Sequence, residues 1–189
     1  MDKHYLLLFS GPFEHKELFW RLERLGVKSD TIAFSSPTQA EFIAPFDVAY
    51  SLDTALIPFS SQTGVRVGAL VSYTHEELED KLLPYALVYF PNMAAHLSDL
   101  ILREMSFGSY TSYSLFMKRF RDVDPELMQA VGAYLRCGKS GLKAADALYV
   151  HRNTFNYRLA NFIKATSLDP RDYHNALFLE LYFQLKNRS

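Results

Sequence analysis

The chain has 189 residues and a formal net charge of −1, with 49% hydrophobic and 22% charged residues. This composition is ordinary for a globular protein and excludes a chain that is disordered over most of its length. The length suits one domain or two small ones. Because Cys137 is the only cysteine, no intramolecular disulfide can form, and we expect a reducing, cytoplasmic location.

Several function classes find no support in the sequence. The longest mostly apolar stretch, residues 82–102, is interrupted by prolines and polar residues, whereas a spanning helix needs about 20 nearly uninterrupted apolar residues. The six histidines show no metal-ligand spacing. No glycine-rich phosphate loop or nucleophile motif is present. We therefore expect no membrane contact, no metal, no cofactor and no enzymatic activity.

In chain order, the N-terminal half begins with a strand, a helix and a second strand. Tyr5–Phe9 is a short apolar run, residues 14–25 carry apolar side chains at helical spacing, and residues 31–34 are rich in strand-forming residues. Residues 47–59 and 65–73 flank a turn-prone segment, which predicts a hairpin with an extended loop. The sheet is expected to be mixed.

Two further helices are predicted between residues 74 and 105. Thr74 and Glu77 have the spacing of a capping box, so a helix should start there. Pro91 suits the first residue of another helix that continues through Met105, whose apolar stripe suits a core or a dimer seam. Residues 106–124 have the composition of a linker, which places the domain boundary near Arg121.

The predicted fold is therefore α+β, with a small mixed α/β domain over residues 1–120 and an all-helical domain over residues 121–189. Charge differs between these parts, since residues 1–120 carry −4 and residues 121–189 carry +3. Residues 136–164 hold six basic side chains and one acidic side chain, Asp146. Such a basic window can attract phosphates.

Four helical patterns follow the boundary: Pro125–Arg136, Leu142–Leu148, Arg152–Ala165 and Tyr173–Lys186. The second and third, at about residues 141–166, predict a helix-turn-helix. In the third, Phe155, Leu159, Phe162 and Ile163 form one apolar stripe that would face the core. The small side chain of Ala145 would allow the two helices to cross closely. The other faces of the third helix, at about residues 152–165, are left for the major groove.

The polar residues of this segment divide into two sets by their chemistry. Arginine can make bidentate contacts to guanine and asparagine to adenine. The candidate base-reading residues are Arg152, Asn153, Asn156 and Tyr157. The candidate phosphate-binding residues, which would position the protein without specifying sequence, are Lys139, Lys143, His151, Thr154 and Arg158.

The run from Lys143 to Leu159, KAADALYVHRNTFNYRL, resembles the C-terminal helix-turn-helix of PucR/CdaR-type bacterial regulators. The specific part is Val-His-Arg-Asn-Thr, and the resemblance extends over about residues 125–185. Phe155 stands where such proteins often have Leu, and Thr166-Ser167 where Thr-Gly is common. The resemblance implies transcription regulation, with a sensory or dimerising region upstream that often includes a degenerate GGDEF-like domain. Because the chain has no Gly-Gly-Asp-Glu-Phe run, cyclase activity is not implied.

These patterns together predict a sequence-specific, DNA-binding transcriptional regulator that binds double-stranded DNA as a homodimer. The N-terminal domain would sense a signal, such as a small-molecule effector, or dimerise. One alternative is a protein-interaction or scaffold module without site-specific DNA reading, which a flat salt response would favour. Another is an enzyme whose α/β half turns over a small molecule, but the sequence shows no nucleophile, metal set or cofactor loop for it.

Overall fold

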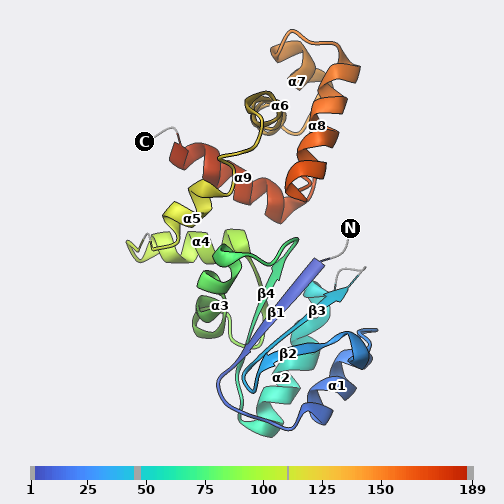
Figure 1. Cartoon of the computed structure of the whole chain (residues 1–189), viewed down its shortest axis with the longest axis vertical. Coiled ribbons are helices and arrows are strands. Elements are labelled where there is room, and N and C mark those ends of the chain that lie inside the picture. The colour runs from blue at the N-terminus through green and yellow to red at the C-terminus, as the bar shows by residue number, and fades with distance from the viewer. Residues whose placement is uncertain (1–2, 45–47, 110, 187–189) are drawn as a thin grey trace. The chain divides into compact units, whose positions relative to one another are not determined.

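The computed structural model describes residues 3–44, 48–109 and 111–186. The chain divides into two compact units, Met1–Ser112 and Tyr113–Ser189. The first contains a sheet and helices, and the described residues of the second form helices only (Figure 1). The predicted α+β class is confirmed. No helix of the described residues is long and apolar enough to cross a membrane.

The first unit is built on a five-stranded sheet in the order β2-β3-β1-β4-β5. The strands are β1 (Lys3–Phe9), β2 (Ala33–Ser36), β3 (Gln39–Ala44), β4 (Val67–Ser72) and β5 (Ala94–His96). All neighbours pair antiparallel except β4 and β5, so the sheet is mixed as expected. The helices are α1 (His15–Glu23), α2 (Leu52–Thr63), α3 (Glu77–Tyr89) and α4 (Leu97–Ser106), with short 3-10 turns at Ser29–Thr31 and Ala49–Ser51. The first four strands with α1 and α2 make a split β-α-β arrangement.

Both faces of the sheet are covered. Side chains of β1 point to the two faces in turn, and buried residues lie on each face. Tyr5 and Leu7 belong to the main core, which also contains the buried residues of α1 and α2. Leu6 points to the other face and pairs in register with Leu70 of β4. On this face α3 approaches closely, since a Cβ at Gly68 would lie 2.3 Å from the backbone nitrogen of Leu87. Only glycine fits at this crossing.

The predicted hairpin over residues 47–73 is wrong in its first half. Residues 52–63 form α2 instead, because Leu52, Ala55, Leu56 and Phe59 lie at helical spacing and are all buried. The expected strand began at Asp47, which lies outside the described residues. The predicted strand over residues 65–73 is confirmed, because β4 occupies most of this range. Strand β3, which pairs with both β2 and β1, was not predicted.

The predicted starts of the next two helices also need correction. The capping box consists of Glu76 and Glu79, two residues later than predicted, while the Thr74 hydroxyl donates to Glu79 Oε1 over 2.9 Å. Pro91 does not begin a helix: it lies in a turn, β5 follows, and α4 begins only at Leu97. A three-residue strand added in parallel to β4 has no local signal in the sequence.

His75 connects strand β3 to the start of α3. Its Nδ1 lies 2.7 Å from Oε2 of Glu41, and its Nε2 lies 2.8 Å from Oδ1 of Asp80. Partial burial lowers the pKa of His75, but the hydrogen bonds and charges of these two carboxylates outweigh it and raise the pKa above its ordinary value. The protonated ring can donate to both carboxylates at once.

The second unit begins at Tyr113, whereas the sequence placed the division near Arg121. Its first helix, α5 (Tyr113–Lys118), falls in the segment that the sequence assigned to a linker. Phe116 and Phe120 are buried against the last helix of the chain: ring centroids are 4.8 Å apart for Phe116 and Phe178, and 4.5 Å apart for Phe120 and Tyr182. These contacts explain why α5 belongs to the helical unit.

Candidate nucleic-acid interface

Four more helices lie in the described residues of the second unit: α6 (Pro125–Arg136), α7 (Gly141–Ala147), α8 (Arg152–Thr166) and α9 (Tyr173–Lys186). The bounds of α6 and α9 are the predicted ones. Helix α6 starts where the Asp124 carboxylate accepts the backbone N–H of Glu126 over 2.8 Å, with Pro125 in the first turn. A side-chain cap and a proline are local signals, so this start can be predicted from the sequence.

One hydrophobic cluster fixes α7 and α8 against α6. It contains Ala130, Ala133 and Tyr134 of α6, both buried alanines of α7, Ala144 and Ala145, and Phe155 of α8. A Cβ at Gly141 would lie 3.2 Å from Cε1 of Phe155, so the start of α7 passes close to this ring. Small residues at the crossings let the helices approach, and Phe155 fills the space between them with no exposed surface.

The turn between α7 and α8 is short and regular. The backbone N–H of Val150 donates to the carbonyl of Ala145 over 3.1 Å, and Tyr149 adopts a left-handed conformation with φ 54°. His151 then caps α8, because its Nδ1 accepts the backbone N–H of Asn153 over 3.2 Å. With Nδ1 occupied as an acceptor, a neutral His151 carries its proton on Nε2, which leaves a donor for an external acceptor.

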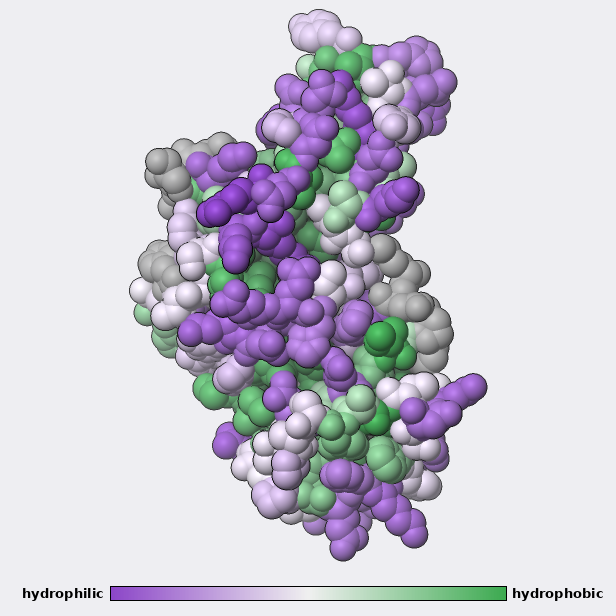
Figure 2. Space-filling model, in the orientation of Figure 1, coloured by the Kyte–Doolittle hydropathy of each residue, from purple (hydrophilic) through white to green (hydrophobic). Residues whose placement is uncertain are grey.

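The candidate base-reading residues lie in the first two turns of α8, and all four are exposed. Arg152, Asn153 and Asn156 are exposed, and Tyr157 retains 68% of its surface. In the same helix, Phe155 and Phe162 are fully buried, with Leu159 and Ile163 partly buried. The predicted stripe therefore faces the unit's interior, and α8 presents a mainly hydrophilic outer surface, part of which is visible in Figure 2.

The candidate phosphate-binding residues fall into two groups in the structure. Lys143, His151 and Thr154 are exposed, and the Lys143 side chain starts from the first turn of α7. Lys139 is also exposed, with Nζ 3.5 Å from the carbonyl oxygen of Arg171. Arg158 differs from them. Its Nη2 lies 2.6 Å from Oε2 of Glu126, and only 18% of its side-chain surface is exposed, so this guanidinium connects α8 to α6.

Two further exposed residues belong to the same surface and were not among the sequence candidates. Lys164 follows Asn153 and Tyr157 at helical spacing, so it continues their line along α8. Tyr149, in the turn, has 97% of its surface exposed. The helical spacing counted from Asn153 could have identified Lys164. Tyr149 lies in a turn with a left-handed backbone, and this conformation is not predicted by the sequence.

Ser167 ends α8 at the position where similar sequences commonly have glycine. Ser167 adopts a left-handed conformation with φ 60°, and its backbone N–H donates to the carbonyl of Ile163 over 2.8 Å. Glycine takes this conformation without strain, which is the physical reason for a glycine at such a helix end. Here serine adopts the same geometry, so the helix end is not altered.

Comparison with known proteins shows what the segment from α6 to α9 is similar to. Residues 127–186 match the model of the PucR C-terminal helix-turn-helix domain. Three uncharacterized mycobacterial proteins, one from Mycobacterium bovis and two from strains of Mycobacterium tuberculosis, are each 35% identical over 65 residues, which make up 34% of this chain and 16% of each relative. The crystal structure of a regulator of polyketide synthase expression from Bifidobacterium adolescentis covers 100% of this chain and 82% of its own, at 17% identity and a TM-score of 0.48. The segment from α6 to α9 is therefore similar to the PucR C-terminal helix-turn-helix domain, and its helices α7 and α8 follow one another as the sequence predicted.

Proposed function

We propose that this chain is a sequence-specific, DNA-binding transcriptional regulator that reads the major groove with α8. The observation that carries the proposal is the family match over residues 127–186, joined to the four exposed polar side chains of Arg152, Asn153, Asn156 and Tyr157. An α-helix fits the major groove of B-DNA, and arginine and asparagine can distinguish base pairs there through bidentate hydrogen bonds.

The roles of the remaining residues follow from their positions. Lys143 and Lys139 supply exposed positive charges for phosphates, and the Nε2–H of a neutral His151 can donate to a phosphate oxygen beside the start of α8. Arg158 holds α8 against α6 through Glu126, so we assign it a phosphate contact only where the DNA displaces that carboxylate. The same reasoning adds Lys164 as a phosphate-binding residue.

We further propose that the protein acts in the cytoplasm as a homodimer. A single recognition helix contacts only a few base pairs, whereas two copies on half-sites about 34 Å apart multiply specificity at moderate affinity. The first unit is the part available to supply a dimer contact or to receive a small-molecule signal. No enzymatic activity forms part of this proposal.

Selection of genomic fragments by the purified full chain tests the function. The enriched site is then titrated against a scrambled duplex at several salt concentrations. A regulator should prefer its site by about 10³-fold or more, and log affinity should fall by about 0.9 per bound phosphate as log salt rises. A two-fold symmetric enriched sequence supports the dimer. Weak, salt-insensitive binding without enrichment contradicts the proposal and favours a protein-interaction module.

A further inference from the structure

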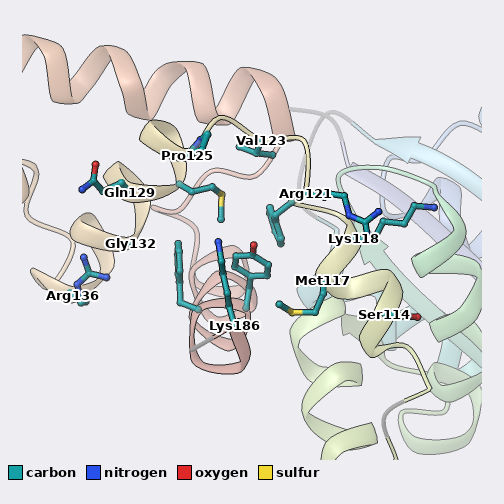
Figure 3. Close-up of a pocket in the computed structure, with 14 residues that line it drawn as sticks. Ser114, Met117, Lys118, Arg121, Val123, Pro125, Gln129, Gly132, Arg136 and Lys186 are labelled. Carbon is teal, nitrogen blue, oxygen red and sulfur yellow. The ribbon is translucent and has the colours of Figure 1, made fainter. Parts of the chain in front are cut away.

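A hollow of about 740 Å³ lies within the helical unit, on a side of α6 that α7 and α8 do not use. Its walls come from α5, the segment that follows α5, one side of α6, and α9. In Figure 3, Gln129, Gly132 and Arg136 lie along one helix on one side of the hollow, and Met117 and Lys118 lie on the other. None of its lining residues belongs to the surface proposed to contact DNA.

Positive charge surrounds this hollow. Its lining includes Lys118, Arg121, Arg136 and Lys186, all exposed, and none of its lining residues carries a carboxylate. Within the described part of the chain, none of these four side chains forms an ion pair. In Figure 3, Arg136 and Lys118 lie on opposite sides of the hollow, so positive charge lies on both sides of it and attracts anions. Either guanidinium group can bind a carboxylate or a phosphate through paired hydrogen bonds.

The floor of the hollow is apolar. Phe120, Met128 and Tyr182 retain only 2%, 6% and 4% of their surfaces, so each is held firmly by the packing of the unit. Met117 and Phe183 are half-buried beside them. Sites for small molecules are concave and mainly apolar, with a few polar groups, and measure about 300 to 1,000 Å³. The hollow lies within this range of size, and its lining combines the apolar floor with a larger share of charged and polar groups.

Gly132 keeps part of the wall open. It lies inside α6, where glycine costs about 1 kcal/mol relative to alanine. A Cβ at this position would lie 3.1 Å from Nη1 of Arg136 and 3.3 Å from Cζ of Phe183. The missing side chain therefore leaves room for the guanidinium and the ring, which supply one charged and one apolar group of the lining.

We propose that this hollow binds a small organic anion that has an apolar body and a carboxylate or phosphate group. The cationic rim takes the anionic group, and the floor of Phe120, Met128 and Tyr182 takes the apolar body. The ligand would contact one side of α6 while Ala130 and Ala133, on its other side, pack against α7 and α8. The site is separate from the N-terminal effector site that the sequence suggested, and its existence does not depend on DNA binding.

Calorimetric titration of the full chain with 1-naphthyl phosphate, in the absence of DNA, tests the proposal. Inorganic phosphate supplies the charge without the apolar body, and 1-naphthol supplies the body without the charge. We expect saturable 1:1 binding of 1-naphthyl phosphate that is about tenfold or more tighter than that of either control compound. No saturable binding, or inorganic phosphate that binds as tightly, overturns the proposal.

Three variants locate the binding site. Arg121→Gln/Arg136→Gln should weaken 1-naphthyl phosphate binding by about tenfold or more, whereas Lys28→Gln/Lys81→Gln, which removes two exposed charges of the first unit, should leave it within about twofold. Gly132→Ala should weaken binding without loss of folding, because alanine favours the helix. Equal binding by both double variants overturns the assignment. The assignment is also overturned if Arg121→Gln/Arg136→Gln binds 1-naphthyl phosphate as the wild type does but binds scrambled duplex DNA more weakly. The basic residues around the hollow would then contact the DNA backbone.

Discussion

The substitution Arg152→Ala tests whether Arg152 contacts DNA bases or stabilises the fold. Arg152 is the first residue of α8, its side chain is exposed, and no hydrogen bond or ion pair joins it to the rest of the described chain. Its removal therefore breaks no intramolecular contact, and alanine has at least equal helix propensity. We expect the free energy of unfolding to change by less than about 0.5 kcal/mol. A larger loss in the free energy of DNA binding would therefore reflect a lost contact to DNA and not a loss of folding.

The expected loss of binding follows from one bidentate contact to guanine. Such a contact contributes about 1 to 3 kcal/mol of discrimination, which corresponds to a loss of roughly 5- to 150-fold in affinity. The loss should be confined to one position of the half-site: at that base pair the variant should tolerate substitutions that the wild type rejects. Lys143→Ala is the matched control, since it should weaken all duplexes about equally and reduce the salt slope by about 1.

Fluorescence anisotropy provides the measurement, with the selected site and a set of duplexes that each carry one substituted base pair. Titrations at three salt concentrations give the slope for each variant. An unchanged binding curve for Arg152→Ala refutes the base-reading role. A uniform loss over all duplexes would instead make Arg152 a phosphate contact and would return base reading to the asparagines of α8.

Three further changes test the packing and the electrostatics. Phe155→Ala should lower the free energy of unfolding of the helical unit by about 3 to 5 kcal/mol, whereas Phe155→Leu should cost less than about 1.5 kcal/mol; far-ultraviolet circular dichroism in urea measures both, and equal costs would contradict the proposed packing. Ser167→Gly should stabilise this unit by up to about 1 kcal/mol, because φ 60° favours glycine, and a loss of stability in the same assay would show that the serine makes a compensating contact. His75→Gln should destabilise the protein by up to about 1 kcal/mol below pH 6.5, since both ion pairs are solvent-exposed. The stabilisation by a histidine with a raised pKa is present below its unfolded pKa and is lost as pH rises through its folded pKa. The free energies of unfolding of the wild type and of His75→Gln should therefore become equal above the folded pKa. Urea titrations in which their difference grows with pH would contradict this assignment.

The helical unit was predictable because its signals are local. Asp124 and Pro125 mark the start of α6, and its predicted bounds agree with the structure. In α8 the apolar side chains return every three to four residues, which separates a buried face from an exposed one before any tertiary contact is known. Arg152, Asn153, Asn156 and Tyr157 were chosen because they lie at the start of this helix or away from the centre of its apolar stripe, and all four are exposed in the structure.

The first unit was harder to predict because its elements depend on partners distant in sequence. Residues 52–59 are mostly apolar, and such a run suits a strand as well as a buried helix. The packing of Phe59 and its neighbours against β1 favours the helix. Strand β3 exists through its pairing with β2 and β1, and β5 through its pairing with β4. Pairing of this kind leaves little trace in a single sequence.

By itself, the sequence determined the α+β class, the four helices after residue 124 and the polar face of α8, since capping and periodicity act within one helix. Only the tertiary structure decided which polar groups remain free. It pairs Arg158 with Glu126 and places His75 between two carboxylates from different elements. It also gathers four basic side chains around the apolar hollow beside α6. Each of these arrangements joins residues that are distant in the chain, and their distances are set by packing rather than by local spacing.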